Sequence, residues 1–342
     1  MTTAPTTSLA VIGAGSWGTA LAIQFARAGQ PTVLWGRAED EPDRMAQERC
    51  NARYLPGSRF PDELKIDGDL HHVISTNTDI LICVPSHAFR LVLEQVQPYL
   101  DPSKRIAWAT KGFEQGTGEL PHQVALDVLG KGYSLAVLSG PTFATEVGAG
   151  LPTAITVASP EPEFAVELAT RISNAQFRAY TSDDIIGVEV GGAVKNVLAI
   201  AAGMSDGFGY GANTRIALIS RGLNEMTRLG VALGAKAETF MGLSGMCDLV
   251  LTCTDDQSRN RRMGLALAGG RGAEEVAKEI GHVVEGVYAA QAVHTVATRA
   301  GVDMPICEQV YRILYEGAAP TDVVDKLMNR ALKPETESHL CP

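Results

Sequence analysis

The first 35 residues place a glycine-rich turn between an apolar strand and an apolar helix. The strand is expected over residues 9–12, the helix over 19–28 with Gly29 as its C-cap, and a second strand over 31–35. The turn reads Gly-Ala-Gly-Ser-Trp-Gly, a GxGxxG pattern in the strand–turn–helix–strand context that a dinucleotide-binding unit requires. A chain that begins in this way is predicted to build a parallel sheet covered by helices.

Each glycine of the pattern has its own physical reason. Gly13 makes the tight turn, Gly15 lets the backbone approach a pyrophosphate, and Gly18 lets helix and strand pack closely. The N-terminus of the following helix adds the positive end of its dipole, which favours phosphate groups. The sequence therefore predicts a dinucleotide cofactor at this turn.

The end of the second strand bears on which dinucleotide is bound. An NAD site usually has Asp or Glu there, to bond the ribose 2′-hydroxyl, but this chain has Gly36 followed by Arg37. A guanidinium suits a 2′-phosphate, whereas Glu39 and Asp40 fall past the strand, in what looks like the first turn of a helix. NADP(H) is therefore favoured and NAD(H) stays possible. Arg37 could also be an exposed loop cation.

Further apolar strands follow, with a helix near residues 161–172. The expected strands cover residues 79–84, 105–109, 135–138, 154–158 and 177–180. Polar or cationic groups follow three of them, namely Ser86, Lys111 and Thr142. Because ligands of open α/β sheets bind outside the carboxyl ends of the strands, these residues are expected to line a pocket.

After residue 180 the strand signals stop, and an N-cap cluster at residues 181–184 opens a series of helical patterns. The expected helices cover residues 183–202, 214–229, 236–240, 258–267, 274–279, 285–299, 305–316 and 321–330, with a loop over 204–213. The predicted fold is an α/β Rossmann-type N-terminal domain with a parallel-rich sheet, residues 1–182, followed by an all-α C-terminal domain, residues 183–342.

The apolar segment 185–202 is expected to be a mostly buried helix, yet it contains Glu189 and Lys195. Burial disfavours a charged ammonium and lowers its pKa, so such a lysine needs a partner or a role. Lys195 could instead extend its head group to water. Gly191 and Gly192 precede it and each weakens a helix by about 1 kcal/mol relative to alanine, which indicates that another group approaches the backbone there.

An aspartate occupies an unexpected place further along the helical half. Asp248 lies in the apolar segment 245–251, where a buried carboxylate needs a cation. Lys195 is the candidate, so these two residues are expected to meet although they are far apart in the chain.

A second polar stretch opens the helix predicted at 258–267. Ser258 is a favourable N-cap, and Arg259 and Asn260 follow it. A helix N-terminus with these side chains suits a phosphate monoester. Arg261 and Arg262 are expected to form a basic, solvated face.

Composition narrows the class of protein. At 342 residues, with 45% hydrophobic and 20% charged residues, the chain is expected to be globular and long enough for two domains. Its formal net charge of −10 argues against nonspecific nucleic-acid binding, and its six cysteines form no CxxC pair, so no metal is expected. The first eight residues do not resemble a signal peptide. Charges and glycines interrupt segment 185–202, so no membrane span is expected and the cytoplasm is the expected location.

Taken together, these motifs resemble the bacterial NAD(P)-dependent glycerol-3-phosphate dehydrogenases over nearly the whole chain. The resemblance rests on order and spacing, which are more specific than any one motif. The motifs are VIGAGSWGTALA (residues 11–22), VPSH (84–87), ATKG (109–112), SGPTFA (139–144), GGAVKN (191–196), DLVLTCT (248–254) and SRN (258–260). The chain departs from the family at Cys247, where glycine is usual, and this is expected to affect the local backbone.

The resemblance implies the reversible reduction of dihydroxyacetone phosphate to sn-glycerol 3-phosphate, which supplies phospholipid synthesis, in an active site between the two domains. It implies Lys195 as the proton donor, Asp248 as its orienting partner and Lys111 as a second positive charge. The implied substrate-binding residues are Lys111, Gly140, Thr142, Lys195, Asp248, Ser258, Arg259 and Asn260. The implied cofactor-binding residues, besides Gly13, Gly15 and Gly18, are Ser16, Trp17, Arg37, Lys111, Ala144, Arg259, Val283 and Glu285.

Two other functions remain open at this point. A dehydrogenase of the same plan could act on a 3-hydroxy acid or a sugar acid, which would need a carboxylate clamp in place of a phosphate site. A catalytically silent nucleotide sensor could also bind NADPH, but it would not need the pair formed by Lys195 and Asp248. Because Rossmann enzymes are often dimers, a homodimer is expected.

Overall fold

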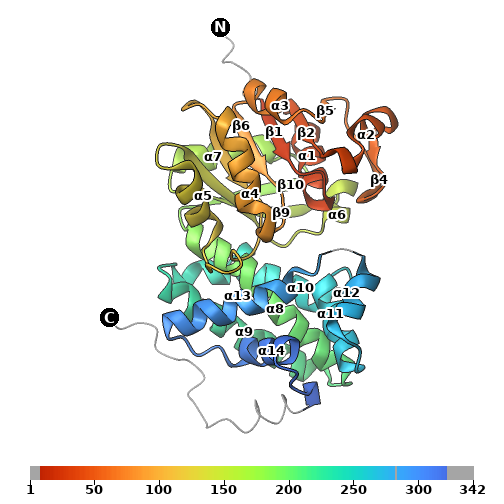
Figure 1. Ribbon diagram of the computed structural model, residues 1–342, viewed down its shortest axis with the longest axis vertical. Helices are drawn as coiled ribbons and strands as arrows, with labels where there is room; N and C mark the ends of the chain where they lie inside the picture. Colours follow the sequence, from red (N-terminus) through yellow and green to blue (C-terminus); the bar gives the residue numbers. More distant parts are fainter. Residues whose placement is uncertain (1–7, 282, 322–342) are drawn as a thin grey trace.

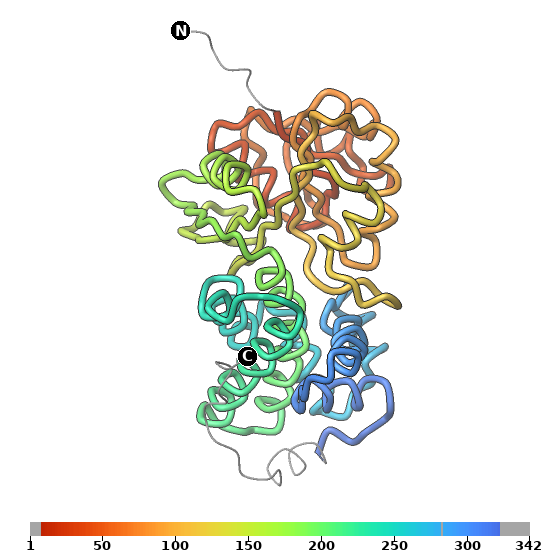
Figure 2. Tube along the Cα trace, turned by 90° about the vertical axis from the view of Figure 1, so that its left-hand side faces the viewer, coloured from red at the N-terminus to blue at the C-terminus, as the bar shows by residue number. Residues whose placement is uncertain are grey.

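The computed structural model describes residues 8–281 and 283–321, which form two bodies (Figure 1). One body is a sheet with helices around it, and the other consists of helices. Figure 2 shows the same two bodies from the side, joined at a narrower waist. The predicted fold class, a Rossmann-type domain followed by a helical domain, is confirmed.

The main sheet has eight strands in the order β10-β9-β8-β7-β6-β1-β2-β5, and β3 and β4 form a separate antiparallel pair. All neighbours in the main sheet are parallel except β8 and β9. The strands are β1 (Leu9–Ile12), β2 (Thr32–Trp35), β3 (Cys50–Asn51), β4 (Leu55–Arg59), β5 (Leu64–Asp67), β6 (Asp79–Ile82), β7 (Arg105–Trp108), β8 (Ser134–Ser139), β9 (Thr153–Ala158) and β10 (Phe177–Ser182).

Strand β1 shows why the sheet is covered on both faces. Its four residues are all buried. Leu9 and Val11 belong to the core that holds side chains of α1 (Ser16–Arg27) and α7 (Pro162–Ile172). Ala10 and Ile12 belong to the core on the other face, which holds side chains of α3 (Leu70–Thr76), α4 (Ser86–Val96) and α5 (Pro121–Leu129). Because successive side chains of a strand point to opposite faces, an unbroken apolar run is what a two-sided core requires.

The helices of this domain match the expected ones where a prediction was made. They are α1 (Ser16–Arg27), η1 (Ala38–Asp40), α2 (Pro42–Glu48), α3 (Leu70–Thr76), α4 (Ser86–Val96), η2 (Gln97–Tyr99), α5 (Pro121–Leu129), α6 (Ala144–Ala149) and α7 (Pro162–Ile172). Helix α1 begins at Ser16, three residues earlier than predicted. Strands β3 to β5 were missed, because they are short and because β4 and β5 contain Pro, Gly or charged residues. Strand β5 forms one edge of the main sheet, which therefore has more strands than the sequence predicted.

The helical domain surrounds α8. Its helices are α8 (Ile185–Gly207), α9 (Ala212–Ala232), η3 (Ala237–Met241), η4 (Leu243–Cys247), α10 (Asp248–Thr254), α11 (Arg259–Ala268), α12 (Ala273–Ile280), α13 (Glu285–Ala300) and α14 (Pro305–Tyr315). The predicted loop over 204–213 is mostly wrong, because α8 continues to Gly207 and α9 begins at Ala212. Segment 236–240 is a 3-10 turn, and the helix predicted over 321–330 lies almost entirely outside the described residues.

Helix α8 is a core helix. Among the described residues it is the one helix long and apolar enough to cross a membrane. However, 94% of its most apolar 18-residue stretch is buried inside the protein. Its glycines allow close packing: a Cβ on Gly191 would lie 2.2 Å from the carbonyl oxygen of Ser244, and one on Gly203 would lie 2.0 Å from that of Arg261. The close approach predicted at the glycines before Lys195 is therefore confirmed at Gly191, where the approaching group is the chain's own Ser244 and not a ligand.

Candidate functional site

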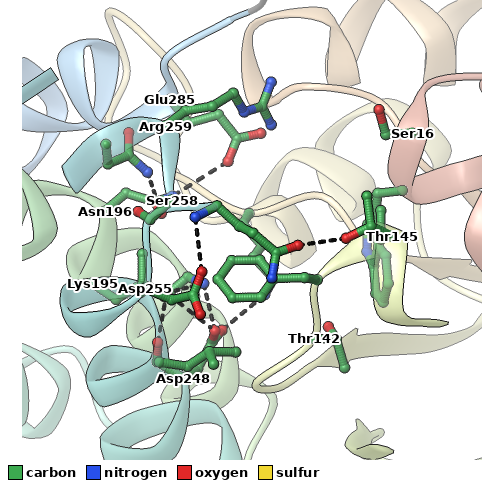
Figure 3. A pocket seen from close by; sticks show the side chains of 18 of the residues that line it. Ser16, Thr142, Thr145, Lys195, Asn196, Asp248, Asp255, Ser258, Arg259 and Glu285 are labelled. Carbon is green, nitrogen blue, oxygen red and sulfur yellow. Dashed lines mark hydrogen bonds and ion pairs between the residues drawn. The ribbon is translucent and has the colours of Figure 1, made fainter. Parts of the chain in front are cut away.

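A cavity of about 660 Å³ opens where the carboxyl ends of the parallel strands face the helical domain. This volume is in the range of small-molecule and cofactor sites. Figure 3 shows Ser16 and Thr145 of the first domain across from Lys195, Asp248 and Asn196 of the second. The predicted site residues that line it are Ser16, Trp17, Lys111, Thr142, Ala144, Lys195, Asp248, Ser258, Arg259, Asn260 and Glu285. Those outside its lining are Gly13, Gly15, Gly18, Arg37, Gly140 and Val283.

One buried carboxylate holds two lysines at the inner end of this cavity. Lys195 Nζ donates to Asp248 Oδ1 at 2.5 Å, and Lys111 Nζ donates to Asp248 Oδ2 at 2.8 Å. Asp248 is 1% exposed, and Lys195 is 7% exposed. The predicted pairing of Lys195 with Asp248 is confirmed, and Lys195 does not extend to open water. Lys111 comes from the loop after β7, so the cluster joins the two domains.

Burial decides the protonation of Lys195. Its pKa is lowered to about 8, and desolvation is the largest cause. The positive charge of Lys111 acts in the same direction, whereas the negative charge of Asp248 acts in the opposite one. A lysine in this position exchanges a proton close to neutral pH, as a general acid or base must. The cluster is therefore suited to protonate an oxygen that develops negative charge.

Thr252 completes the surroundings of Lys195 and was not predicted. Its Oγ1 accepts a hydrogen bond from Lys195 Nζ at 3.0 Å and donates to the backbone oxygen of Asp248 at 2.6 Å. Thr252 lies one helical turn after Asp248 on α10. The sequence contained this signal, because residues four apart share a helix face, but the segment was not predicted to be a helix.

Cys247 fits its position without strain. It is the last residue of η4, a single π-helical turn, and its φ of −66° and ψ of −44° are helical. The expected disturbance beside Asp248 does not occur, because no positive φ is needed there. The π-helical turn directs Asp248 toward the cavity at the point where α10 begins.

The predicted strand-end pocket is confirmed for two of its three residues. Lys111 and Thr142 line the cavity, but Ser86 does not. Ser86 packs beside Gly112 instead, because a Cβ added to Gly112 would lie 3.0 Å from the Oγ of Ser86. Gly140 contributes its carbonyl oxygen, which accepts from Lys111 Nζ at 3.3 Å and from Thr142 Oγ1 at 3.2 Å. The end of β8 therefore provides Lys111 with a second acceptor besides Asp248.

The start of α11 forms another wall of the cavity. Ser258 is the N-cap and accepts a hydrogen bond from the Arg261 N–H at 3.2 Å, as predicted. The exposed side chain of Arg259 reaches the cavity. Asn260 is tied into the protein, because its Nδ2 donates to Asn196 Oδ1 and its Oδ1 accepts from the Gly286 N–H, both at 2.9 Å. A cation and a helix N-terminus thus face the same space, which suits an anion.

Arg261 corrects a prediction. It does not lie on a solvated face but is 9% exposed and forms ion pairs with Asp206, at 2.7 Å, and Asp256. Arg262 is exposed as expected and also lines the cavity. The helical period of α11 puts these adjacent arginines on different faces, which the basic run alone did not reveal.

The glycine-rich turn has the geometry that a pyrophosphate requires. Gly13 has a φ of +117° and a Cβ there would lie 2.6 Å from the Cys83 carbonyl oxygen. A Cβ on Gly18 would lie 2.0 Å from the Gly13 oxygen, whereas nothing lies within 4 Å of one on Gly15. Gly15 is the N-cap of α1 and provides no side chain to bond the first N–H groups of the helix. These groups and this open space fit the pyrophosphate of a dinucleotide.

The turn after β2 carries the predicted cofactor cation. The Arg37 side chain is 62% exposed, and its Nε lies 3.4 Å from Asp40 Oδ2. Asp40 also accepts a hydrogen bond from the Arg37 N–H at 3.0 Å, so Asp40 is occupied in holding Arg37. On the other side of the site, Glu285 begins α13 and accepts from Asn196 Nδ2 at 3.3 Å, and Val283 lies two residues before it.

Three polar side chains join the two domains across the cavity mouth and were not predicted. Thr145 Oγ1 donates to Gln257 Oε1 at 2.6 Å, and Gln257 Nε2 donates to Glu146 Oε1 at 3.0 Å. Thr145 and Glu146 belong to α6, whereas Gln257 precedes α11. These bonds join residues 112 and 111 positions apart in the chain, and the sequence contained no periodic signal for them.

Glu189, the other ionisable group of the apolar segment 185–202, does not line the cavity. Its carboxyl group accepts from Trp108 Nε1 and from the His122 N–H, both at 2.9 Å, and lies 2.5 Å from His122 Nδ1. Burial raises the pKa of Glu189. This group therefore ties α8 to β7 and α5 of the first domain, two turns before Lys195 on the same helix.

Comparisons with known proteins identify the family of this chain. The family model described as the N-terminus of NAD-dependent glycerol-3-phosphate dehydrogenase matches residues 8–165, and that of its C-terminus matches residues 184–325. A glycerol-3-phosphate dehydrogenase (NAD(P)+) of Methylococcus capsulatus is 54% identical over 96% of this chain and 98% of its own. One of Pasteurella multocida is 53% identical over 98% and 99%.

A solved structure extends the likeness to the fold. The crystal structure of glycerol-3-phosphate dehydrogenase from Coxiella burnetii superposes with a TM-score of 0.91 at 49% identity, over 95% of this chain and 100% of the other. Both halves of the chain, and with them both walls of the cavity, are included in these matches. The chain belongs to the NAD(P)-dependent glycerol-3-phosphate dehydrogenase family of oxidoreductases.

Proposed function

We propose that this protein reduces dihydroxyacetone phosphate to sn-glycerol 3-phosphate with NAD(P)H, reversibly, and so supplies phospholipid synthesis. The observation that carries the proposal is the cluster of Lys195, Asp248 and Lys111, which shares one cavity with Arg259. A proton donor and an anion site thus serve the two ends of a small phosphorylated ketone. The membership of the family and the names of its close relatives support the same reaction.

Lys195 is proposed as the proton donor in reduction and the acceptor in oxidation. When bound, NAD(P)H supplies the hydride that the C2 carbonyl carbon receives. Negative charge then develops on the carbonyl oxygen, and Lys195 protonates it, oriented by Asp248 and Thr252. Lys111 places a second positive charge beside this oxygen, and such preorganised stabilisation is usually the largest single catalytic term.

The substrate phosphate is proposed to lie at the start of α11. Arg259 supplies a guanidinium there, and the helix N-terminus at Ser258 supplies the positive end of its dipole. Asn260 is proposed to act in two ways. Its hydrogen bonds to Asn196 and Gly286 fix the position of this helical turn, and its side chain contributes to the substrate site. Thr142 and Gly140 close the substrate site from the end of β8.

The cofactor is proposed to cross the cavity from α1 toward Lys111, with NADP(H) preferred and NAD(H) accepted. Gly13, Gly15 and Gly18 allow the pyrophosphate to approach the backbone, and Arg37 faces the adenosine ribose. The other proposed contacts are made by Ser16, Trp17, Lys111, Ala144, Arg259, Val283 and Glu285, most of which line the cavity.

The wider organisation is also proposed. The boundary between the domains is placed at residues 182 and 183, where β10 ends at Ser182 and α8 begins at Ile185. A homodimer is proposed because Rossmann enzymes are often dimers, and sedimentation of the purified protein would test it. A cytoplasmic location is proposed as well.

The deciding experiment is the oxidation of NADPH and of NADH on addition of dihydroxyacetone phosphate, followed by the absorbance of the reduced nicotinamide. Consumption of both, with NADPH preferred, supports the substrate and the role of Arg37 together. Consumption of NADH alone supports the enzyme and removes the Arg37 argument. If folded protein consumes neither, while a 3-hydroxy acid reduces NADP+, the rival hydroxy-acid function replaces this one.

A further inference from the structure

A second arginine reaches the turn that carries Arg37. Arg53 lies between β3 and β4, and its Nη1 donates to the backbone oxygen of Glu39 at 2.7 Å. Arg37 belongs to the same turn, with Nε 3.4 Å from Asp40. Both arginine side chains are exposed. Two guanidinium groups from different segments of the chain therefore contact adjacent residues, Glu39 and Asp40, after the end of β2.

The segment that carries Arg53 is attached to the glycine-rich turn. Asn51 is 1% exposed, and its Nδ2 donates to the Ala14 oxygen at 2.8 Å while its Oδ1 accepts from the Tyr54 N–H at 3.1 Å. Ser16 Oγ donates to the Tyr54 oxygen at 2.6 Å. Arg53 is thus anchored on both sides in the sequence, next to the turn that receives the pyrophosphate.

The partners of Arg53 leave its charge available. In the part of the chain that the structure describes, these partners are the Glu39 carbonyl oxygen and the ring of Tyr54, whose centroid lies 4.9 Å from its guanidinium carbon. Arg44, on neighbouring α2, differs because its guanidinium is paired with Glu41 at 3.2 Å and with Glu48 at 2.8 Å. A carbonyl oxygen does not neutralise a cation, whereas two carboxylates do.

We propose that Arg53 binds the 2′-phosphate of NADPH together with Arg37, an inference that rests on the cofactor preference proposed above. The adenosine ribose of a dinucleotide lies beside the carboxyl end of the second strand, and both arginines contact the turn that follows this strand. A phosphate dianion can accept from two guanidinium forks, and a second fork raises both affinity and selectivity for the 2′-phosphate. Arg53 is therefore a specificity-determining residue of the cofactor site.

The test is a binding titration without substrate, in which the fluorescence of the reduced nicotinamide reports the Kd of NADPH and of NADH. The two cofactors differ only in the 2′-phosphate. For Arg53→Ala we expect a roughly tenfold or larger rise in the Kd of NADPH, the size expected for a lost hydrogen bond to a charged group, and an unchanged Kd of NADH. Arg44→Ala removes the same charge from a paired site and should leave both values unchanged.

A double variant separates a shared site from two independent ones. If Arg37 and Arg53 bind one phosphate, the loss of NADPH affinity in the double variant differs from the product of the two single losses. Arg53→Lys should retain part of the preference, because it keeps the charge but not the fork.

Other results would overturn the inference. Equal losses for NADPH and NADH in Arg53→Ala would mean that the arginine only supports the turn, and unchanged values would mean that it does not act at all. Wild-type protein that binds both cofactors equally would reject the proposed preference, whereas reduction of dihydroxyacetone phosphate with NADH would still support the proposed reaction. Failure of the inference and failure of the function are thus distinguishable.

Discussion

The two ends of the proposed cofactor path contrast in their electrostatics. At the inner end, Lys195 is 7% exposed and shares the buried Asp248 with Lys111. At the outer end, the side chain of Arg37 is 62% exposed, and Asp40 holds it at the surface. Both ends use a cation held by an aspartate, but one pair is buried and the other is exposed.

This difference separates chemistry from recognition. Burial moves the pKa of Lys195 to about 8, whereas the hydrogen bond that Arg37 donates to Asp40 raises the pKa of Arg37, which stays charged at any working pH. The buried end should therefore respond to pH and the exposed end to salt, because ions screen exposed charges and hardly reach buried ones.

The largest effect is expected at the buried end. Lys195→Ala should lower kcat by roughly 10²–10⁴, the range for a lost acid–base group, with little loss of folded protein. The buried carboxylate of Asp248 stays compensated, because Lys111 remains bound to it. Steady-state rates and a thermal melt check both points. Lys131→Ala, an exposed lysine outside the cavity, is the control, and a near-normal kcat would remove Lys195 from its role.

A smaller effect is expected at the wall formed by α11. Arg259→Ala should raise the KM for dihydroxyacetone phosphate roughly 10- to 100-fold, the cost of a lost hydrogen bond to a charged group, with a smaller change in kcat. Arg271→Ala removes an exposed arginine that pairs with Glu275 at 2.8 Å and should leave the KM unchanged. If Arg259→Ala behaves like this control, the substrate phosphate binds elsewhere.

The pH dependence should follow the depressed pKa of Lys195, which lies near 8. Reduction needs the protonated amine, so its rate should decline above that pKa, to about a tenth one pH unit higher. Oxidation needs the neutral amine, so its rate should rise through the same range. Initial rates in both directions across neutral to alkaline pH test this, and profiles that rise or fall together would contradict it.

The smallest effect should appear on changing salt. An increase from about 0.05 M to about 0.5 M NaCl shortens the screening length to a few ångströms, so the KM for NADPH should rise several-fold while that for NADH changes less. The pH midpoint of reduction should stay in place, because Lys195 and its partners are buried. If the pH midpoint of reduction moves with salt while the preference for NADPH stays constant, the charge at Lys195 is the screened one and the charge at Arg37 is not, which is the opposite of the proposed difference.

Local sequence patterns were sufficient to predict the main strands and helices of the protein. The strands over 9–12 and 105–109, the glycine turn and the long helix from 185 follow from apolar runs, glycines and caps that act over a few residues. Short segments with weak patterns were missed, as in β5 and η4, because their conformation depends on the neighbours against which they pack.

The site required the tertiary structure. The sequence predicted that Lys195 would need a partner such as Asp248, because a buried charge is costly. That Lys111 shares the same carboxylate, although it lies 137 residues before Asp248 in the chain, follows only from the contact between the two domains. Arg53 shows the same limit. The residues around Arg53 in the sequence do not distinguish it from any other exposed arginine. It reaches the turn after β2 only because the hydrogen bond from Ser16 to the Tyr54 oxygen holds its segment in place.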